Sequence, residues 1–247
     1  MLEIILNTFL SGVVGTGLGG LIGVLFGKKS EKHMSILLSF SGGIMLSVVC
    51  FDLIVESINL SNILYTAIFS VVGVIIIMLI NTVVDKYFKF NEVKELSINK
   101  YRLLKSGLIM VMAIGIHNFP EGLAVGSSFS YDTKMGLFLS LLIAFHNLPE
   151  GMAISAPLVG GEMSKVKAVM LTALSGVPTI IGGVIGHFIG SASNIGVAFS
   201  LAFASGAMLY VVFYEIIPQS LLMSKSNLNS LFILIGMLVG LIFISGY

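Results

Sequence analysis

The sequence is poor in charged residues. Asp, Glu, Lys and Arg make up 10% of its 247 residues, whereas 56% are hydrophobic. Soluble domains carry roughly 25% charged residues, so this composition excludes a soluble fold. Tryptophan is absent, and the single cysteine, Cys50, has no partner for an intramolecular disulfide.

Apolar runs long enough to cross a hydrocarbon core of about 30 Å recur along the whole chain. They predict eight transmembrane helices, at 4–27, 34–57, 61–84, 107–130, 135–160, 168–190, 195–219 and 228–246. The expected fold class is therefore all-α integral membrane, with residues 1–247 forming one transmembrane domain. We expect the first run to be a retained helix, because it is long, rich in glycine and not preceded by the basic segment of a secretory signal.

The basic residues predict the orientation of these helices. Of the thirteen Lys and Arg residues, all but Lys134 fall in the odd-numbered connections or beside them. Because cytoplasmic loops carry the excess of Lys and Arg, the odd connections are expected in the cytoplasm. The long basic loop at about 85–106 is one of them, and both termini are expected on the non-cytoplasmic side.

Two internal similarities predict a repeat. The segment Gly43–Ser57 aligns without gaps on Gly206–Ser220, which places Asp52 on Glu215. The two helices run in opposite directions, as in the inverted repeats of secondary transporters. The second similarity aligns the fourth helix with the fifth, so we expect a 3+2+3 arrangement in which helices one to three mirror helices six to eight around a central pair.

Acidic side chains lie within the predicted helices, where no Lys or Arg accompanies them. They are Asp52, Glu56, Glu121, Glu150 and Glu215. A carboxylate at the centre of a membrane helix costs about 2.5–3.5 kcal/mol. Protons, a bound cation or a water-filled path must offset that cost, and each of these indicates ion handling.

The sequence His-Asn-x-Pro-Glu-Gly occurs twice, beginning at His117 and at His146. In each copy His and Glu stand four residues apart and share one helix face, so His117 with Glu121 and His146 with Glu150 offer four ligands. Imidazole with carboxylate suits Zn²⁺ and neighbouring first-row ions, whereas an all-oxygen set suits Mg²⁺ or Ca²⁺. The adjacent residues Asn118 and Asn147 add neutral carbonyl oxygens. The predicted site lies near mid-membrane.

Asp52 and Glu215 are expected on either side of this site. Under the assigned orientation, Asp52 lies toward the outer third of the second helix and Glu215 toward the inner third of the seventh. We interpret them, with Glu56, as candidate way-stations for an ion. A polar contact between helices is the alternative interpretation for each.

The doubled sequence, the eight helices and the predicted orientation resemble the prokaryotic branch of the ZIP (Zrt-, Irt-like protein) family of metal-ion transporters. The resemblance implies a metal site between helices four and five, often binuclear. The first site would use His117, Glu121, His146 and Glu150, and the second Asn118, Asn147 and the same glutamates. Members carry Zn²⁺, Fe²⁺, Mn²⁺ or Cd²⁺ toward the cytoplasm. Many have a further glutamate in helix six near the place where this chain has Thr179, so the second site lacks one carboxylate.

Import of a divalent transition metal, with Zn²⁺ as the first candidate, is therefore the leading hypothesis, with the metal as substrate and with no catalytic residue or cofactor. The main alternative is an intramembrane zinc-dependent hydrolase, because catalytic zinc also takes His and Glu ligands. The absence of a His-Glu-x-x-His sequence disfavours it. A homodimer is a further expectation, since glycines at every fourth position from Gly15 to Gly27 give the first helix a smooth face for close packing, either within the chain or between chains.

Overall fold

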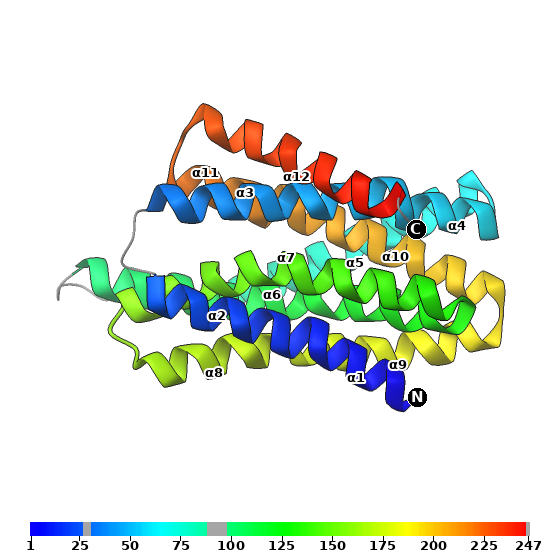
Figure 1. Cartoon of the computed structure of the whole chain (residues 1–247), viewed down its shortest axis with the longest axis horizontal. Helices are drawn as coiled ribbons and strands as arrows, with labels where there is room; N and C mark the ends of the chain where they lie inside the picture. The colour runs from blue at the N-terminus through cyan, green and yellow to red at the C-terminus, as the bar shows by residue number, and fades with distance from the viewer. Residues whose placement is uncertain (27–30, 88–97, 246–247) are drawn as a thin grey trace.

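The structure is a bundle of long helices (Figure 1). This computed structural model describes residues 1–26, 31–87 and 98–245, among which there is no β-strand. Eight stretches of helix are long and apolar enough to cross a membrane, as predicted: Leu2–Leu25, Ser35–Leu60, Ile63–Val83, Leu103–Tyr131, Thr133–Gly160, Lys165–Ala192, Asn194–Met223 and Asn227–Ser245. Helices suit a bilayer because they satisfy every backbone hydrogen bond within one segment.

Four of the spans are each one continuous helix. These are α5 (Ile63–Tyr87), α6 (Ile98–Tyr131), α7 (Thr133–Gly160) and α12 (Asn227–Ser245). Helices α5 and α6 thus reach into both ends of the segment predicted as a loop at about 85–106, whose central residues 88–97 lie outside the described residues.

The other four spans are interrupted. The first is α1 (Leu2–Thr8), η1 (Phe9–Val14) and α2 (Gly15–Phe26); the second is α3 (Glu31–Val48), η2 (Val49–Leu53) and α4 (Ile54–Leu60); the sixth is α8 (Lys165–Ser175) and α9 (Val177–Ala192); the seventh is α10 (Asn194–Val211), η3 (Val212–Ile216) and α11 (Ile217–Met223). Each η segment is a π-helical turn, a feature that often marks functional sites.

Short capped turns reverse the chain at the end of the bundle where both termini lie (Figure 1). The carboxylate of Asp132, between α6 and α7, accepts a hydrogen bond from the backbone N–H of Met135 at 2.9 Å. The hydroxyl of Ser193 accepts one from the N–H of Gly196 at 3.1 Å and begins α10. These side chains satisfy N–H groups that a helix start leaves unpaired.

The spans pack in two sets. In one set, α2 packs on α7 and α8, while α6 packs on α7 and α9; in the other, α3 packs on α12 and α10 on α5. Figure 1 shows α3 and α12 above α6 and α7, with α8 and α9 below them. Helices α6 and α7 are consequently covered by other spans, which is where a polar site must be placed in a membrane protein.

Glycines allow the closest of these contacts. At four of them, an added Cβ would meet a main-chain carbonyl of the neighbouring span: Gly43 meets Ile233, Gly206 meets Ser70, Gly73 meets Phe203, and Gly236 meets Phe40. The contacts form two pairs related by the offset that aligns Gly43–Ser57 with Gly206–Ser220. This recurrence supports the inverted repeat, while the complete 3+2+3 arrangement stays a prediction.

The glycine face of the first span packs within the chain. A Cβ on Gly15 would meet Ala144, one on Gly19 would meet Leu148, and one on Gly23 would meet Met152 and Ser155, all on α7. Gly27 lies outside the described residues. Because α7 covers this face, it gives no support to a homodimer, which stays a prediction without that basis.

Substituting Gly19 by Ala is expected to destabilise the bundle, because the added methyl group would meet the carbonyl of Leu148. Forcing extra carbon into a packed contact costs roughly 1–3 kcal/mol. Circular dichroism at increasing temperature should show a lower melting temperature. The matched control is Gly115→Ala, where the nearest atoms to the added Cβ, in Ser175, are 3.7 and 3.9 Å away. Equal melting temperatures for the two variants would contradict the proposed close contact.

Candidate metal centre

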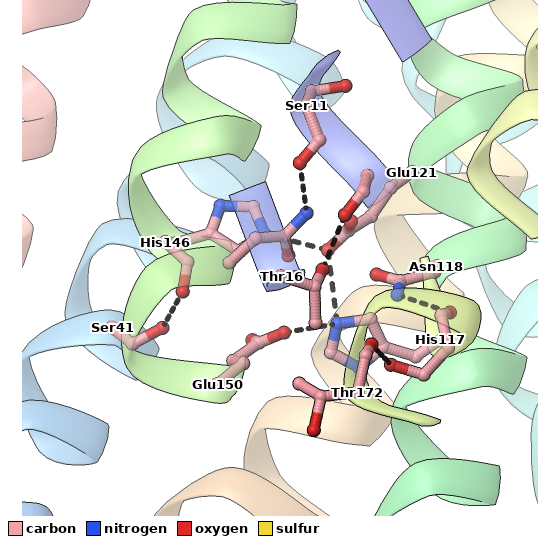
Figure 2. Close-up of polar contacts among 12 residues, drawn as sticks. Ser11, Thr16, Ser41, His117, Asn118, Glu121, His146, Glu150 and Thr172 are labelled. Carbon is pink, nitrogen blue, oxygen red and sulfur yellow. Dashed lines mark hydrogen bonds and ion pairs between the residues drawn. The ribbon is translucent and has the colours of Figure 1, made fainter. Parts of the chain in front are cut away.

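The two copies of His-Asn-x-Pro-Glu-Gly face one another across the contact of α6 with α7 (Figure 2). His117 and Glu121 project from α6, His146 and Glu150 from α7, and all four side chains are at most 1% exposed. His117 lies near the middle of the span Leu103–Tyr131 and His146 near the middle of Thr133–Gly160. The cluster is therefore about equally far from both ends of the bundle.

The contacts join the two helices through their polar atoms. Glu121 Oε1 lies 2.7 Å from His146 Nε2 and 3.1 Å from His117 Nε2. Glu150 Oε2 lies 3.4 Å from His117 Nε2. One ligand atom from each of His117, Glu121 and His146 falls within 4.8 Å of the other two, a spacing at which a single ion can bind all three.

No Lys or Arg pairs with the two carboxylates in the part of the chain that the structure describes. The ion pairs described for them involve only histidine, and three of their buried oxygens accept no hydrogen bond: Glu121 Oε2, Glu150 Oε1 and Glu150 Oε2. Burying unpaired charge is strongly unfavourable. A divalent cation bound between the two glutamates would remove that penalty, so the residues fit a metal ion.

The asparagines of the two copies are fully buried beside the histidines. The amide nitrogen of Asn118 donates to the carbonyl of Ser175 at 2.8 Å, and that of Asn147 donates to the carbonyl of Ser11 at 2.9 Å. Neither amide oxygen has a hydrogen-bond partner. Neither oxygen is therefore occupied by a hydrogen bond, and the prediction that they are metal ligands stays a prediction.

The glycine that ends each copy serves packing. A Cβ on Gly122 would meet the carbonyl of Thr179 in α9, and one on Gly151 would meet the carbonyl of Thr16 in α2. The residue after each glutamate is therefore a point of close contact with the backbone of a neighbouring span. Thr179 is itself fully buried, and its hydroxyl oxygen has no hydrogen-bond partner.

The remaining predicted site residues lie outside this cluster. Asp52 is in η2 and Glu215 is in η3, at equivalent positions of the aligned segments. One oxygen of Asp52 is buried without a hydrogen-bond partner. Glu56, one turn further along, accepts a 3.4 Å hydrogen bond from Asn59. The structure thus places none of these three carboxylates among the four central side chains.

Glu215 has a partner that the sequence analysis overlooked. The amide nitrogen of Asn81, on α5, donates to Glu215 Oε1 at 2.7 Å. Both residues line a cavity of about 210 Å³, which Leu38, Met110 and Ile114 also line. Asn81 was detectable as an isolated amide in an apolar run, but nothing in the sequence indicated its partner.

The sequence analysis also overlooked a contact of His146. The hydroxyl of Ser41, on α3, donates to the main-chain carbonyl of His146 at 3.0 Å (Figure 2). This bond joins the second set of spans to the helix that carries two of the central side chains. A serine in an apolar helix gives no signal of such a contact, because most serines in helices bond within their own helix.

Comparisons with known proteins identify relatives of the whole chain. A family profile described as "ZIP Zinc transporter" matches residues 91–247. Proteins named zinc transporter ZupT are similar over most of the chain. The one from Chlorobaculum parvum is 37% identical, covering 86% of this chain and 85% of its own. That of Chlorobium chlorochromatii is 35% identical over 84% of each chain, and that of Lysinibacillus sphaericus 34% identical over 92% of this chain and 91% of its own.

Zn²⁺ is expected to stabilise the folded protein, because the unpaired carboxylate oxygens are satisfied only when a cation binds. At a free concentration 100 times the dissociation constant, a ligand adds about 2.7 kcal/mol to folding stability. Circular dichroism should show a melting temperature that rises with Zn²⁺ and falls back with a chelator. Mg²⁺ is the comparison and should raise the melting temperature less than Zn²⁺, because it does not favour the two imidazole ligands. An equal Zn²⁺-dependent rise in the double variant His117→Ala, His146→Ala would show that the ion binds elsewhere.

Proposed function

This chain belongs to the ZIP family of zinc transporters, and on that premise we propose that it carries Zn²⁺ into the cytoplasm through the centre on α6 and α7. The chain is a multi-pass membrane protein, and its relatives are named as transporters rather than enzymes. The hydrolase alternative is accordingly not favoured. The observation that carries the proposal is the buried group of two histidines and two glutamates, with carboxylate oxygens that no donor satisfies.

The centre offers two kinds of ligand. His117 Nε2 and His146 Nε2 converge on Glu121 Oε1, which makes a nitrogen-rich position suited to Zn²⁺. The second oxygen of Glu121, both oxygens of Glu150 and the two asparagine amide oxygens have no hydrogen-bond partner, and they supply ligands for a second, oxygen-rich position. We propose that Zn²⁺ binds most tightly at the first position. The second binds less tightly, because Thr179 contributes at most a neutral hydroxyl there.

The proposed route passes one acidic residue on each side of the centre. Zn²⁺ enters from the outer side near Asp52 and leaves near Glu215, which bonds to Asn81 beside a cavity of about 210 Å³ between α6 and the second set of spans. Asp52 and Glu215 each lie in a π-helical turn, a feature that often marks functional sites and so supports a role for both residues on the route. In η2 the N–H of Ile54 bonds to the carbonyl of Val49, and in η3 that of Ile217 bonds to Val212, so each turn is one residue wider than an α-helical turn.

The direction and the range of metals are further parts of the proposal. Inward transport requires that the outer end of the bundle is the one with both termini, as the basic residues predict. Cd²⁺, Fe²⁺ and Mn²⁺ have ligand preferences near that of Zn²⁺ and are proposed as weaker substrates. Mn²⁺ favours oxygen ligands, so the two imidazoles disfavour it most.

Removing both central carboxylates is expected to abolish transport. In proteoliposomes, the double variant Glu121→Ala, Glu150→Ala should show no Zn²⁺ flux above protein-free vesicles, because the neutral site no longer offsets dehydration of the ion. Competing Cd²⁺, Fe²⁺ and Mn²⁺ in the wild-type assay ranks the substrates. Glu3→Ala, an exposed carboxylate at the start of α1, is the matched control and should transport normally. Flux that persists in the double variant would overturn the proposed site.

Glu215→Gln is expected to slow transport while leaving Zn²⁺ binding intact, because Glu215 acts after the centre on the proposed route. Flux should fall several-fold at saturating Zn²⁺, whereas the dissociation constant measured by chelator competition should stay within two-fold of wild type, a difference of about 0.4 kcal/mol. An unchanged flux would remove Glu215 from the route. Weakened binding would instead make it part of the centre.

A further inference from the structure

Two main-chain carbonyls determine how the asparagines face the metal centre. The carbonyl oxygen of Ser175 lies 2.8 Å from the side-chain nitrogen of Asn118, and that of Ser11 lies 2.9 Å from the side-chain nitrogen of Asn147. A carbonyl oxygen only accepts hydrogen bonds, so the amide atom facing it must be the nitrogen. Each amide oxygen is thereby directed away from the neighbouring span, and each is buried without a donor.

The carbonyl of Ser11 is available because the first span makes a π-helical turn. In a regular α-helix the N–H of Gly15 would bond to Ser11. Here it bonds to the carbonyls of Leu10 and Gly12 instead, at the end of η1. The irregular turn therefore provides the acceptor that Asn147 uses.

The carbonyl of Ser175 is available for a different reason. The sixth span breaks between α8 and α9 at Gly176, and the N–H of Thr179 bonds to the carbonyl of Gly176 at 3.2 Å rather than to Ser175. Pro178 follows the break, and its ring has no N–H to continue the α-helical pattern. The first and sixth spans are thus irregular in different ways, and each irregularity leaves a main-chain carbonyl available to accept a hydrogen bond from an asparagine side chain.

We infer that the main-chain carbonyls of Ser11 and Ser175 are positioning groups for metal binding, which hold Asn147 and Asn118 with their amide oxygens presented to the ion. This inference rests on the proposed function of the centre. The hydroxyls of the two serines take no part, because that of Ser11 bonds to Thr8 and that of Ser175 to Thr172. The irregular turns themselves are the functional feature.

The physical advantage is preorganisation. An amide that turns freely presents its N–H₂ group to the site part of the time, and N–H₂ cannot ligate a cation. Fixing the side chain in the ligating orientation before the ion arrives removes an ordering cost from binding. The effect of each carbonyl must therefore act through one asparagine, Ser175 through Asn118 and Ser11 through Asn147.

The test is a double-mutant cycle on zinc affinity of the purified full-length chain. Pro178→Ala introduces an N–H and favours joining α8 to α9, which lets the N–H of Thr179 compete for the carbonyl of Ser175. We expect the dissociation constant of Zn²⁺ at the second, oxygen-rich position, measured by competition with a chromogenic chelator after the first position is filled, to rise about ten-fold. In an Asn118→Ala background the same change should add less than two-fold, whereas in an Asn147→Ala background it should keep its full effect.

Pro157→Ala is the matched control, a proline near the end of α7 about three helical turns beyond Asn147. It should leave the dissociation constant unchanged. Equal effects of Pro178→Ala in all three backgrounds would overturn the inference, because a change that disturbs only the general packing does not depend on Asn118. An unchanged affinity in Pro178→Ala alone would overturn it as well.

If Pro178→Ala does not fold, Asn118→Asp provides the test. Aspartate has nearly the same shape but cannot donate to Ser175 when ionised, so zinc should bind more weakly although a carboxylate is normally the better ligand. Tighter binding would overturn the inference. The double variant Glu121→Ala, Glu150→Ala separates the two claims: zinc binding that survives in it refutes the proposed function, while zinc binding lost there, together with additive effects of Pro178→Ala, refutes only the positioning role.

Discussion

Two glutamates without a compensating cation, buried at the middle of an apolar bundle, are the constraint on which the structure depends. Glu121 and Glu150 are completely buried, and histidines are their only described ion-pair partners. Burying such a group is unfavourable unless a cation or proton compensates. The helices that carry the glutamates must accordingly be shielded from lipid by other spans, which explains why α6 and α7 lie inside the bundle and α5 and α12 at its periphery.

Glycine makes that shielding possible. Gly122 and Gly151, directly after the two glutamates, allow the backbones of α9 and α2 to approach closely, and Gly15, Gly19 and Gly23 continue the contact along α7. In lipid no hydrophobic driving force draws helices together, so close van der Waals contact and polar bonds must hold them. The bonds from Asn118 to Ser175 and from Asn147 to Ser11 supply polar bonds at the same crossing points. Packing and ligand orientation are consequently determined by the same few residues.

The sequence was sufficient to predict the eight spans and the four central side chains, because both depend on local patterns. Apolar runs reveal spans whatever their neighbours, and a spacing of four residues places His117 with Glu121 on one face. The contacts of Asn81 with Glu215 and of Ser41 with His146 could not be predicted, since they join spans far apart in the sequence. The π-helical turns were also missed. A turn with one extra residue leaves the apolar pattern unchanged, and its effect is visible only in which carbonyls remain unpaired.

The division of the centre between α6 and α7 has a consequence for how such a protein originates. Each helix contributes one histidine, one glutamate and one asparagine, and each asparagine is held by a different irregular span. A chain of half this length, ending after one copy of His-Asn-x-Pro-Glu-Gly, would hold only half of the ligands. Two such chains would complete the centre only by inserting in opposite orientations in the same membrane. In this chain the two copies lie on consecutive helices, so one polypeptide fixes their antiparallel pairing and the two repeats can diverge, as Thr16 with its hydroxyl bonded to Gly12 and Thr179 with its hydroxyl unpaired do.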